Sequence, residues 1–349
     1  MATVQRIERE AARLLPDLLR DLLDEPDLTL EPPEAAPDRG IDFVAHDNRG
    51  RTWAMQVKAS SGPGQVVTAA RHLAESAPED AIPLFVVPFM SRSGADAAAR
   101  ERLNWLDLSG NAAIRAENLY VWVDGRPNRY TSRGRRSSPF APKSARITRT
   151  LLLEPARWWL QRDLVDATGL DDGTVSRIVS RLDEELLLER RDRELRPRDP
   201  VLLLDAWADH YRFDRHDAVS CHVSGSGIEV ARKVAPRLEA LDVHHAFTGL
   251  PAAWAIDHFA RFRLSTVYVE DDPRDVAERL EARQGTRGAN LQILGPNDVG
   301  VFAGEQKRDG LNCVATVQIY LDLLNLAERA DEAARHLRAH HLRWHGASR

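Results

Sequence analysis

Cysteine and long apolar runs are scarce in this 349-residue sequence, and each scarcity excludes a class of protein. Cys221 and Cys313 are the only cysteines, too few for a disulfide framework or for a zinc site with four cysteine ligands. The longest nearly apolar run, residues 81–90, is far shorter than the roughly 20 residues that a membrane-spanning helix needs. Residues 1–19 alternate charge and leucine and contain no signal-peptide core. We therefore expect a cytoplasmic protein without membrane contact.

The composition also excludes a chain that is disordered along most of its length. Hydrophobic residues make up 43% and charged residues 29% of the sequence, and glycine and proline occur at ordinary frequencies. The formal net charge is -5 at pH 7, so any contact with nucleic acid depends on local basic patches. A chain of this length is expected to form two or three globular domains.

One such basic patch is the stretch of residues 126–149. It contains no acidic residue, and serine, proline and glycine are interspersed. Two interpretations remain open: a solvated linker between domains, or an arm that contacts DNA phosphates, with Arg135 and Arg136 as candidate contacts. The basic residues of this stretch are Arg126, Arg129, Arg133, Arg135, Arg136, Lys143, Arg146 and Arg149.

Apolar periodicity and turn residues divide the sequence into three globular segments and a linker. The predicted boundaries are 1–128 for an α/β domain, 129–144 for the basic linker, 145–216 for a helix-turn-helix with a wing, and 217–349 for a second α/β domain. In the first domain we predict helices at 6–23, 66–76 and 94–102 and strands at 41–45, 52–59, 82–89 and 119–123. In the last domain we predict helices at 228–241, 273–284, 320–326 and 330–341 and strands at 219–223, 265–269, 291–294 and 314–317.

The strongest motif is Arg162–Leu182, which has the spacing of a helix-turn-helix. Apolar residues recur where helices 161–168 and 174–186 must pack, with Gly169 at the turn and a further helix, 147–153, before them. Hydroxyls and arginines remain for the exposed face, and they suit hydrogen bonds to phosphates and to base edges in a major groove. Strands 187–190 and 194–198 are predicted to form a wing with arginines at its tip. A winged helix that serves only packing or dimerisation is the alternative. The candidate DNA-binding residues are Thr174, Ser176, Arg177, Ser180, Arg181, Arg190, Arg191 and Arg193.

Three side chains of the predicted amino-terminal hairpin are expected to share one face. Alternate strand residues point to the same side, so Gln56 and Lys58 meet Asp42 of the neighbouring strand. This pattern resembles the PD-(D/E)xK restriction endonuclease-like core. The resemblance implies a nuclease in which Asp42 and Gln56 hold Mg²⁺ while Lys58 orients water or offsets charge on the scissile phosphate. Glu8 or Glu10 is a candidate for a further acidic group.

The amino-terminal motif departs from that family at Gln56, where glutamate or aspartate is usual. The change lowers the negative charge of the site and weakens divalent-metal binding, although some Mrr-like restriction endonucleases carry the same glutamine. The alternatives are an ordinary hairpin with an exposed Asp and Lys, or the nuclease fold without its activity. The segment Trp105–Asn111 either lines the same cleft or forms a structural turn that closes the sheet.

The carboxy-terminal segment contains a glycine-rich loop, Val223–Val230, between a predicted strand and a helix. Val230 stands where a dinucleotide-binding loop has its third glycine, which disfavours that function. Gly225-Ser226 match the start of a nucleotidyltransferase motif, but His244 stands where the second carboxylate belongs. We expect a nucleotidyltransferase-like α/β fold without the activity, and Asp271–Pro273 fits a helix cap as well as a catalytic acid.

Four motifs in this segment resemble the AbiEi family of type IV toxin-antitoxin antitoxins. In that family a winged helix-turn-helix precedes a nucleotidyltransferase-like domain. The resemblance covers about 147–341 and implies a repressor of its own operon whose carboxy-terminal domain has an antitoxin or oligomerisation role. It leaves the amino-terminal domain unexplained. The motifs are Thr248–Trp254, Val267–Pro273, Val317–Leu324 and Glu332–Leu337.

Three functional hypotheses follow for this multidomain α/β protein. The sequence favours a sequence-specific transcriptional regulator, antitoxin-like and autorepressing, that requires no cofactor and is not an enzyme. Its expected partners are double-stranded DNA and a second copy of the chain, and the family resemblance adds a cognate toxin. The alternative is a Mg²⁺-dependent DNA nuclease targeted by the winged helix, as in restriction or phage defence. The third is an antitoxin that binds protein and for which DNA binding is secondary.

Overall fold

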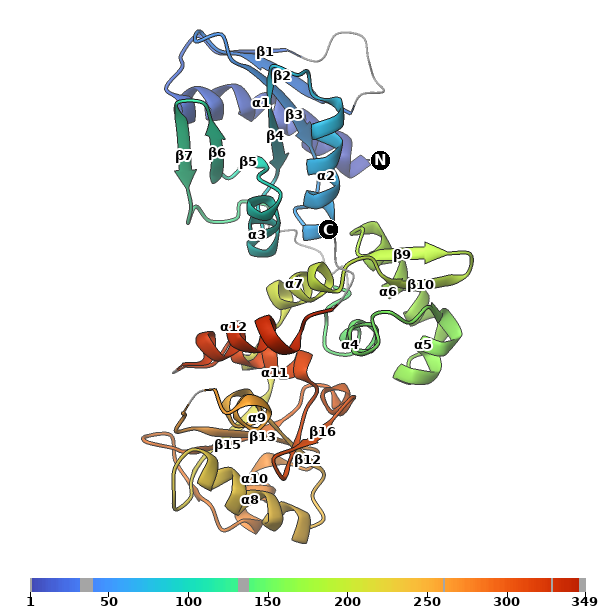
Figure 1. Ribbon diagram of the computed structural model, residues 1–349, viewed down its shortest axis with the longest axis vertical. Coiled ribbons are helices and arrows are strands. Elements are labelled where there is room, and N and C mark those ends of the chain that lie inside the picture. The colour runs from blue at the N-terminus through green and yellow to red at the C-terminus, as the bar shows by residue number, and fades with distance from the viewer. Residues whose placement is uncertain (1, 32–39, 131–137, 260, 328, 345–349) are drawn as a thin grey trace. The chain divides into compact units, whose positions relative to one another are not determined.

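The computed structural model describes residues 2–31, 40–130, 138–259, 261–327 and 329–344 (Figure 1). Contacts divide the chain into two units, Met1–Arg136 with Asp183–Leu187, and Ser137–Leu182 with Leu188–Arg349. Among the described helices, none is long and apolar enough to cross a membrane.

The first unit contains a seven-stranded sheet whose spatial order follows the sequence, from β1 to β7. Strands β3, β4 and β5 are parallel, and the other neighbours are antiparallel. Helices α2 (Pro63–Ser76) and α3 (Arg92–Arg100) make the crossovers that parallel strands require. The strands are β1 (Thr29–Glu31), β2 (Phe43–His46), β3 (Thr52–Val57), β4 (Ala81–Val87), β5 (Asn104–Asp107), β6 (Ala112–Ala116) and β7 (Leu119–Val123).

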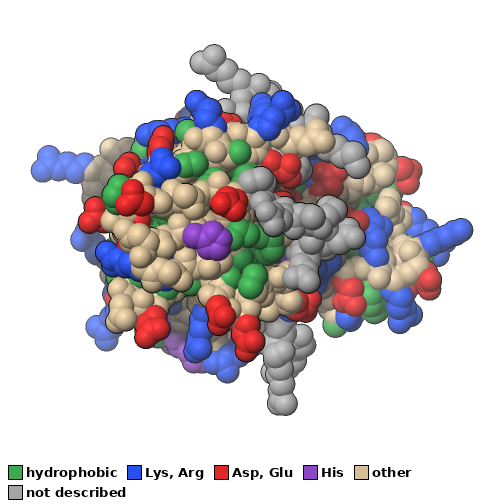
Figure 2. All heavy atoms as spheres, turned by 90° about the horizontal axis from the view of Figure 1, so that it is seen from above, with side chains coloured by type: hydrophobic (Ala, Val, Ile, Leu, Met, Phe, Trp, Pro, Cys, Tyr) green, Lys and Arg blue, Asp and Glu red, His purple; other side chains and the backbone are tan. Residues whose placement is uncertain are grey.

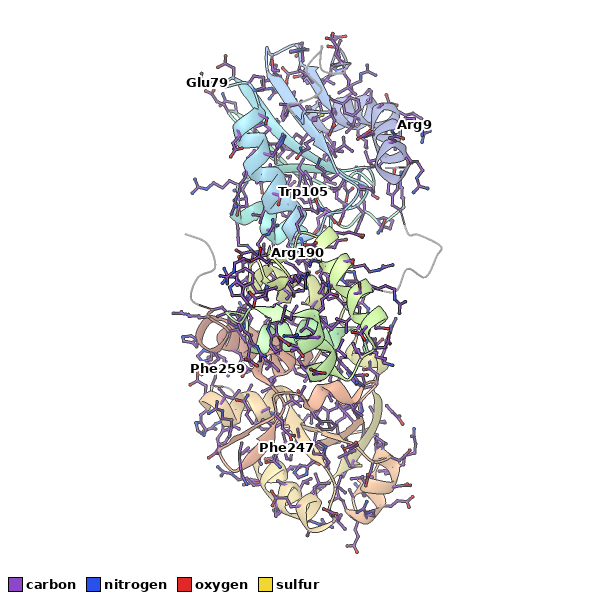
Figure 3. The ribbon with its side chains drawn as sticks, turned by 90° about the vertical axis from the view of Figure 1, so that its right-hand side faces the viewer. Arg9, Glu79, Trp105, Arg190, Phe247 and Phe259 are labelled. Atoms are coloured by element: carbon purple, nitrogen blue, oxygen red, sulfur yellow. The ribbon has the colours of Figure 1, made fainter. Side chains whose placement is uncertain are left out.

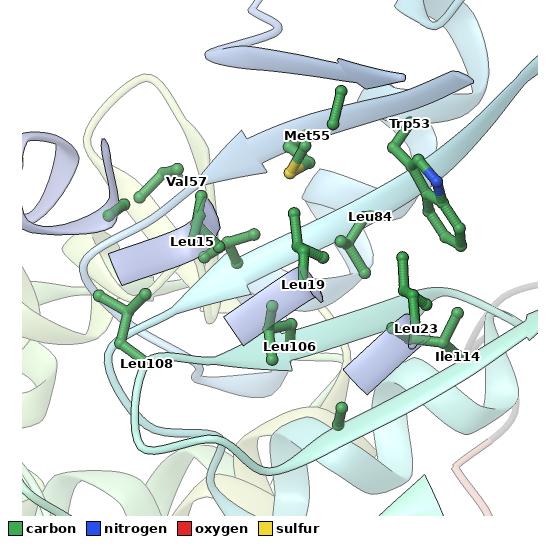
Figure 4. Packing of buried hydrophobic residues seen from close by; sticks show 14 of the residues in the cluster. Leu15, Leu19, Leu23, Trp53, Met55, Val57, Leu84, Leu106, Leu108 and Ile114 are labelled. Carbon is green, nitrogen blue, oxygen red and sulfur yellow. The ribbon is translucent and has the colours of Figure 1, made fainter. Parts of the chain in front are cut away.

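Strand β4 shows why helices cover both faces of this sheet. Leu84 and Val86 pack in one apolar cluster with the leucines of α1 (Ala2–Leu23), whereas Phe85 and Val87 pack in a second cluster with α2 and α3. Successive strand residues point to opposite faces, so an uninterrupted apolar strand needs a helical layer on each side. Figure 4 shows Leu15, Leu19 and Leu23 of α1 beside the sheet in the first cluster.

The second unit begins with a helical segment and a small three-stranded sheet of order β8-β10-β9. Helix α7 follows the sheet, and Asp199 caps it by accepting a hydrogen bond from the Val201 N–H. The elements are α4 (Ala145–Leu153), β8 (Trp159–Leu160), α5 (Gln161–Thr168), α6 (Asp172–Glu184), β9 (Leu188–Arg191), β10 (Glu194–Pro197) and α7 (Pro200–His210).

The rest of the second unit surrounds another seven-stranded sheet, of order β14-β11-β15-β13-β12-β17-β16. The pairs β13–β15 and β12–β17 are parallel and the others antiparallel. The strands are β11 (Asp217–His222), β12 (His245–Thr248), β13 (Ser265–Val269), β14 (Arg283–Gln284), β15 (Leu291–Gly295), β16 (Gln306–Arg308) and β17 (Leu311–Cys313). The helices are η1 (Phe213–Arg215), α8 (Ile228–Ala240), α9 (Gly249–Asp257), α10 (Pro273–Arg279), η2 (Val299–Phe302), α11 (Thr316–Leu323) and α12 (Ala330–His341).

One predicted strand is wrong. The apolar run at 314–317 predicts a strand, but β17 ends at Cys313 and α11 begins at Thr316. A short apolar run does not distinguish a strand from a buried helix, and α11 is buried along most of its length, so no polar face reveals its period. Strands β1, β5, β6 and β12 and helices α7 and α9 lie where we predicted no regular element.

Candidate functional site: a nucleic-acid interface and a buried polar network

The candidate DNA-reading surface is built from α5, α6 and the β9–β10 hairpin. Leu164, Val175 and Val179 are buried at helical spacing and hold the two helices together. Gly169 ends α5 with a φ of 65°, a left-handed conformation that costs glycine little. Its N–H donates to the Val165 carbonyl at 2.9 Å. Helix α5 has its predicted bounds, and α6 begins two residues earlier than predicted.

The exposed face of α6 carries the predicted hydroxyl and arginine side chains. Ser176, Arg177 and Ser180 are exposed, while Thr174 and Arg181 are half-buried. Within the described chain, no hydrogen bond or ion pair engages the Arg181 side chain. The Arg181 guanidinium can therefore meet a ligand without the loss of a hydrogen bond or ion pair among the described residues.

The first turn of α6 orients Arg177. Asp171 caps the helix, because its carboxylate accepts hydrogen bonds from both the N–H and the hydroxyl of Thr174, each at 2.8 Å. These bonds hold the pKa of Asp171 below its usual value. The Arg177 guanidinium donates to the Thr174 Oγ1 at 2.9 Å and to the Gly173 carbonyl at 3.1 Å. In this conformation Arg177 lies over the first turn, so contact with a base requires a change of its rotamer.

Arginines of the wing are arranged around Trp158. The guanidinium carbons of Arg196 and Arg191 lie 4.3 and 5.3 Å from the Trp158 ring centroid. Arg193 follows Asp192, whose φ of 54° makes the tight turn at the wing tip. Arg190, labelled in Figure 3, is exposed on β9. The wing thus presents cations beside an aromatic ring.

The basic stretch at 126–149 divides into residues with different surroundings. Arg135 and Arg136 lie outside the described residues. Arg146 and Arg149 belong to α4 and face inward, so neither is part of a solvated arm. The Arg146 guanidinium binds both oxygens of Asp298, at 2.7 and 2.8 Å, and the Thr168 carbonyl at 3.1 Å. The arm interpretation is therefore wrong for this end of the stretch. In Figure 2, Lys and Arg side chains are interspersed with Asp and Glu on the face displayed.

A polar network is buried where α11 meets the carboxy-terminal sheet, the sheet that contains Phe247 in Figure 3. The Asp322 carboxylate accepts hydrogen bonds from the hydroxyls of Thr248 and Tyr211. Gln318 Nε2 donates to the same carboxylate at 2.8 Å. Burial raises the pKa of Asp322 to about 6 although these donors favour its charged form. The sequence signal for this network is a lone carboxylate within the apolar run of α11.

His216 extends the network on the far side of Tyr211. The His216 Nδ1 accepts the Asn297 N–H at 3.1 Å, which leaves Nε2 as the protonated nitrogen, 3.0 Å from the Tyr211 hydroxyl. Burial, together with the charge of Arg149, lowers the pKa of His216 to about 4. The imidazole is therefore neutral at physiological pH.

Arg149 reaches this network from α4. Its side chain is buried, and its Nη2 donates to the Gln318 Oε1 at 2.6 Å. Its guanidinium carbon lies 5.1 Å from the Trp207 ring centroid. The Nε and Nη1 atoms are buried and have no hydrogen-bond partner among the described residues. Burial lowers the pKa of this guanidinium.

The amino-terminal candidates Asp42, Gln56 and Lys58 come together at the carboxyl end of β3. Burial raises the pKa of Asp42, while a hydrogen bond from the Val57 N–H at 2.7 Å and the charges of Lys58 and His72 act against that rise. His72, on α2, was not predicted, because only the fold brings α2 across this face of the sheet. The geometry therefore brings the three candidates together and adds an imidazole.

The donor set at this position does not fit a Mg²⁺ centre with two carboxylates. Among the candidates Asp42, Gln56 and Lys58, only Asp42 has a carboxylate. The Gln56 Nε2 donates to the Gly40 carbonyl at 2.9 Å and lies 3.1 Å from the His72 Nδ1. The Gln56 Oε1 is buried without a partner in the described part of the chain. No three His, Cys, Asp or Glu side chains among the described residues could share a metal ion. Glu10, a candidate further acid, accepts a hydrogen bond from Tyr130 at 3.2 Å.

The segment Trp105–Asn111 forms a structural turn. The buried Asp107 carboxylate accepts hydrogen bonds from the Asn111 N–H at 2.9 Å and the Met90 N–H at 3.1 Å. Gly110, with a φ of 97°, follows this carboxylate in the turn. Of the two interpretations of the segment, the structure favours closure of the sheet.

The glycine-rich loop after β11 is held by its own neighbours. Lys233 Nζ donates to the Ser224 carbonyl at 2.8 Å, and Asn290 Nδ2 donates to the Gly225 carbonyl at 2.8 Å. A Cβ at Gly227 would lie 2.5 Å from the Phe262 carbonyl oxygen, so close packing explains this glycine. The loop thus has a structural explanation that requires no phosphate.

The carboxylates proposed for a transferase also have structural roles. Asp272 caps α10 by accepting the Arg274 N–H at 2.8 Å, as the cap interpretation predicts. His244 lies between two glutamates, with its Nδ1 2.9 Å from Glu270 and its Nε2 3.2 Å from Glu305. Hydrogen bonds to these carboxylates raise the pKa of His244 against the opposing effect of burial. Glu270 and Glu305 are thus held in a hydrogen-bonded cluster around His244.

Comparison with known proteins identifies one part of the chain. Residues 197–343 match an antitoxin family. The family is described as transcriptional regulator, AbiEi antitoxin, type IV TA system, and the match covers α7, the carboxy-terminal sheet and its helices. No curated protein and no solved structure matches the chain. The predicted resemblance to this family is confirmed for the matched residues, whereas the restriction endonuclease-like resemblance stays a prediction.

Proposed function

We propose that the protein is a sequence-specific DNA-binding regulator that represses its own operon as an antitoxin. The observation that carries the proposal is the exposed face of α6, with Ser176, Arg177 and Ser180, in the same compact unit as the antitoxin-like region. Short hydroxyls and arginines can bind phosphates and base edges, and arginine can bind guanine with two hydrogen bonds.

The wing supplies the second contact of this proposal. Arg190, Arg191 and Arg193 are exposed, and cations at a wing tip suit the phosphate backbone, which carries no sequence information. The two surfaces therefore have separate roles: α6 selects the sequence and the wing adds affinity that weakens with salt. A regulator of net charge -5 needs such a local basic surface because the whole protein does not attract DNA.

A gel-shift titration of the full chain on DNA from upstream of its own gene tests this proposal, with unrelated DNA as competitor. We expect Arg177→Ala and Arg181→Ala each to weaken specific binding by about 1–3 kcal/mol, and Arg193→Ala to weaken binding to all sequences alike. The matched control is Arg335→Ala, since Arg335 is also an exposed helical arginine bonded to the carbonyl four residues before it, at 3.3 Å. Equal affinity for upstream and unrelated DNA would contradict the proposal.

The proposed partners are a second copy of the chain and a cognate toxin. The antitoxin family match supports a toxin as partner of the carboxy-terminal region. Mass measurement by light scattering tests dimerisation, and co-purification with the product of a neighbouring gene tests toxin binding. If Arg177→Ala abolishes DNA binding but leaves toxin affinity intact, the two activities use separate surfaces. An antitoxin that acts only through protein contact would bind toxin and show no specific DNA complex.

The Mg²⁺-dependent nuclease remains a second candidate because Asp42, Gln56 and Lys58 share one end of β3. The single carboxylate disfavours it. Incubation of the full chain with plasmid DNA in EDTA, Mg²⁺ or Mn²⁺ distinguishes the two functions. The regulator leaves the DNA intact in every buffer, whereas a nuclease gives metal-dependent fragments that Asp42→Ala and Lys58→Ala remove without loss of DNA affinity.

A further inference from the structure

A cavity of about 260 Å³ lies within the second unit, beside α4, α7 and the loop that leads into η2. Phe140, Trp207 and Val301 give it apolar walls, and Arg149 is also in its lining. Its volume is slightly below the range of about 300–1,000 Å³ that is typical of ligand pockets. The size suits a molecule with one aromatic ring and a charged group.

Two buried hydrogen-bond donors of the Arg149 guanidinium indicate which kind of ligand the cavity can bind. Buried polar atoms almost always have hydrogen-bond partners, and a buried charge without them costs free energy. Arg149 is 3% exposed, yet its Nε and Nη1 have no partner among the described residues. The two nearby carboxylates are engaged elsewhere, since Asp298 binds Arg146 through both oxygens and Asp322 accepts several hydroxyl and amide donors.

The charges around the cavity favour an anion. Arg212 and Arg215 also line it, and both are exposed. Arg212 donates to the backbone carbonyls of Asp209 and Tyr211. Asp298 is the single carboxylate among the described lining residues, and Arg146 neutralises it. A cavity with cations at its floor and rim concentrates anions from solution.

We propose that this cavity binds a small organic anion whose carboxylate or phosphate pairs with Arg149 and whose apolar body packs against Trp207 and Phe140. The Arg149 Nη1 can donate to an oxygen of the oxyanion, and a hydrogen bond between ionised partners is shorter and stronger than one between neutral groups. The aromatic walls exclude water from the pair and accept the ring of the ligand.

Occupancy of the cavity would affect DNA binding because α4 forms one of its walls. Arg146 of α4 binds Asp298 beside the cavity and also binds the Thr168 carbonyl, immediately before the turn that leads into α6. A ligand that moves Asp298 therefore acts on the helix-turn-helix through one side chain. This consequence rests on the proposed function, whereas the binding of the anion does not.

Calorimetry and thermal unfolding of the full chain with three probes test the site: benzoate, phenyl phosphate and the neutral benzamide. We expect saturable one-to-one binding and a higher melting temperature with at least one of the two anions and neither effect with benzamide. The better anion identifies carboxylate or phosphate as the recognised group. Inorganic phosphate, which has no apolar body, should bind at least tenfold more weakly than phenyl phosphate if phosphate is that group.

Two variants, one that removes the charge and one that fills the cavity, test whether the anion binds at this site. Arg149→Met removes the charge, and Ala141→Phe, in the lining, fills the cavity and leaves Arg149 in place. Each should weaken binding of the preferred anion at least tenfold, while Arg335→Ala should bind it as the unmodified chain does. The proposal is overturned if neither anion binds saturably, or if both variants bind like the unmodified chain.

The gel shift repeated with the preferred anion separates this site from the proposed function. A change in affinity for upstream DNA that is lost in Ala141→Phe supports an effector role. Anion binding with unchanged DNA affinity refutes the effector role and leaves the site standing. Absence of any specific DNA complex refutes the proposed function alone, because the calorimetric result does not depend on DNA.

Discussion

The buried histidine His216 predicts a measurable dependence of stability on pH. Its pKa is about 4 in the folded chain, because of burial and of the charge of Arg149, and about 6.5 when the chain unfolds. Between these values the unfolded chain binds a proton that the folded chain does not, so the stability that depends on neutral His216 is lost as pH falls from 6.5 to 4. A difference of about 2.5 pKa units corresponds to about 3 kcal/mol.

Replacement of His216 by asparagine isolates this contribution. At pH 7 the variant lacks the hydrogen bonds to Tyr211 and Asn297 and is less stable than the unmodified chain. At pH 4 the unmodified chain carries the cost of its neutral buried histidine, and the variant does not. The destabilisation by His216→Asn should therefore be about 3 kcal/mol smaller at pH 4 than at pH 7.

The pKa of Asp322 predicts a second pH dependence of stability, opposite in sign to that of His216. Its folded pKa of about 6 lies above the unfolded value, so the folded chain retains a proton between pH 4 and 6 and loses stability as pH rises through that range. In the unmodified chain this trend and the His216 trend nearly cancel. Removal of either residue should expose the slope of the other, and Asp322→Asn should make stability rise with pH.

Urea denaturation from pH 4 to 7.5 at constant ionic strength measures both slopes. Amide hydrogen exchange on peptides from α11 measures the unfolding of the second unit separately from that of the first unit. A difference between His216→Asn and the unmodified chain that stays constant with pH would refute the reasoning, because it would show that His216 has the same pKa in the folded and unfolded chains.

Three further predictions concern stability in other parts of the chain. Gly169→Ala forces a residue with a Cβ into a φ of 65° and should cost about 1 kcal/mol in urea denaturation; no loss would contradict the turn geometry. Asp171→Ala removes the cap of α6 and should destabilise its first turn, seen as faster hydrogen exchange in α6 and not in α8. Leu19→Ala leaves a cavity between α1 and the sheet and should cost about 2–5 kcal/mol, whereas the same change at the exposed Leu324 should cost far less.

Local pattern was sufficient to predict elements with clear periodicity and clear ends. Residues 161–168, 265–269 and 330–341 have the predicted type and bounds in α5, β13 and α12. Several of the unpredicted elements, among them β12 and α9, are buried along nearly their whole length. Helix α9 is apolar around most of its circumference, so it has no polar face from which a helical period can be read. The run that begins at Val314 was assigned to a strand for the same reason, although it enters α11.

The candidate sites show a similar limit. The exposed residues of α6 could be predicted because an amphipathic helix separates its two faces in the sequence. His72 and Arg149 could not be assigned roles, since their partners lie on other elements that only the fold brings together. Arg149 in particular belongs to a basic stretch whose composition predicts a solvent-exposed segment. The charge of a residue does not predict whether its side chain is buried, because a charged residue within an amphipathic helix can lie on either face.

Helix α4 explains why the helix-turn-helix and the antitoxin-like region form one unit. Arg146 and Arg149 leave the same helix one turn apart, one toward Asp298 and the other toward Gln318. Breaking either contact leaves a buried or half-buried charge without its partner, so separation of the two parts is costly. Because Arg146 also binds the carbonyl at the end of α5, a partner that displaces Asp298 must alter the support of the turn before α6. For the proposed function, α4 therefore offers a direct route by which an event in the carboxy-terminal region can reach α6.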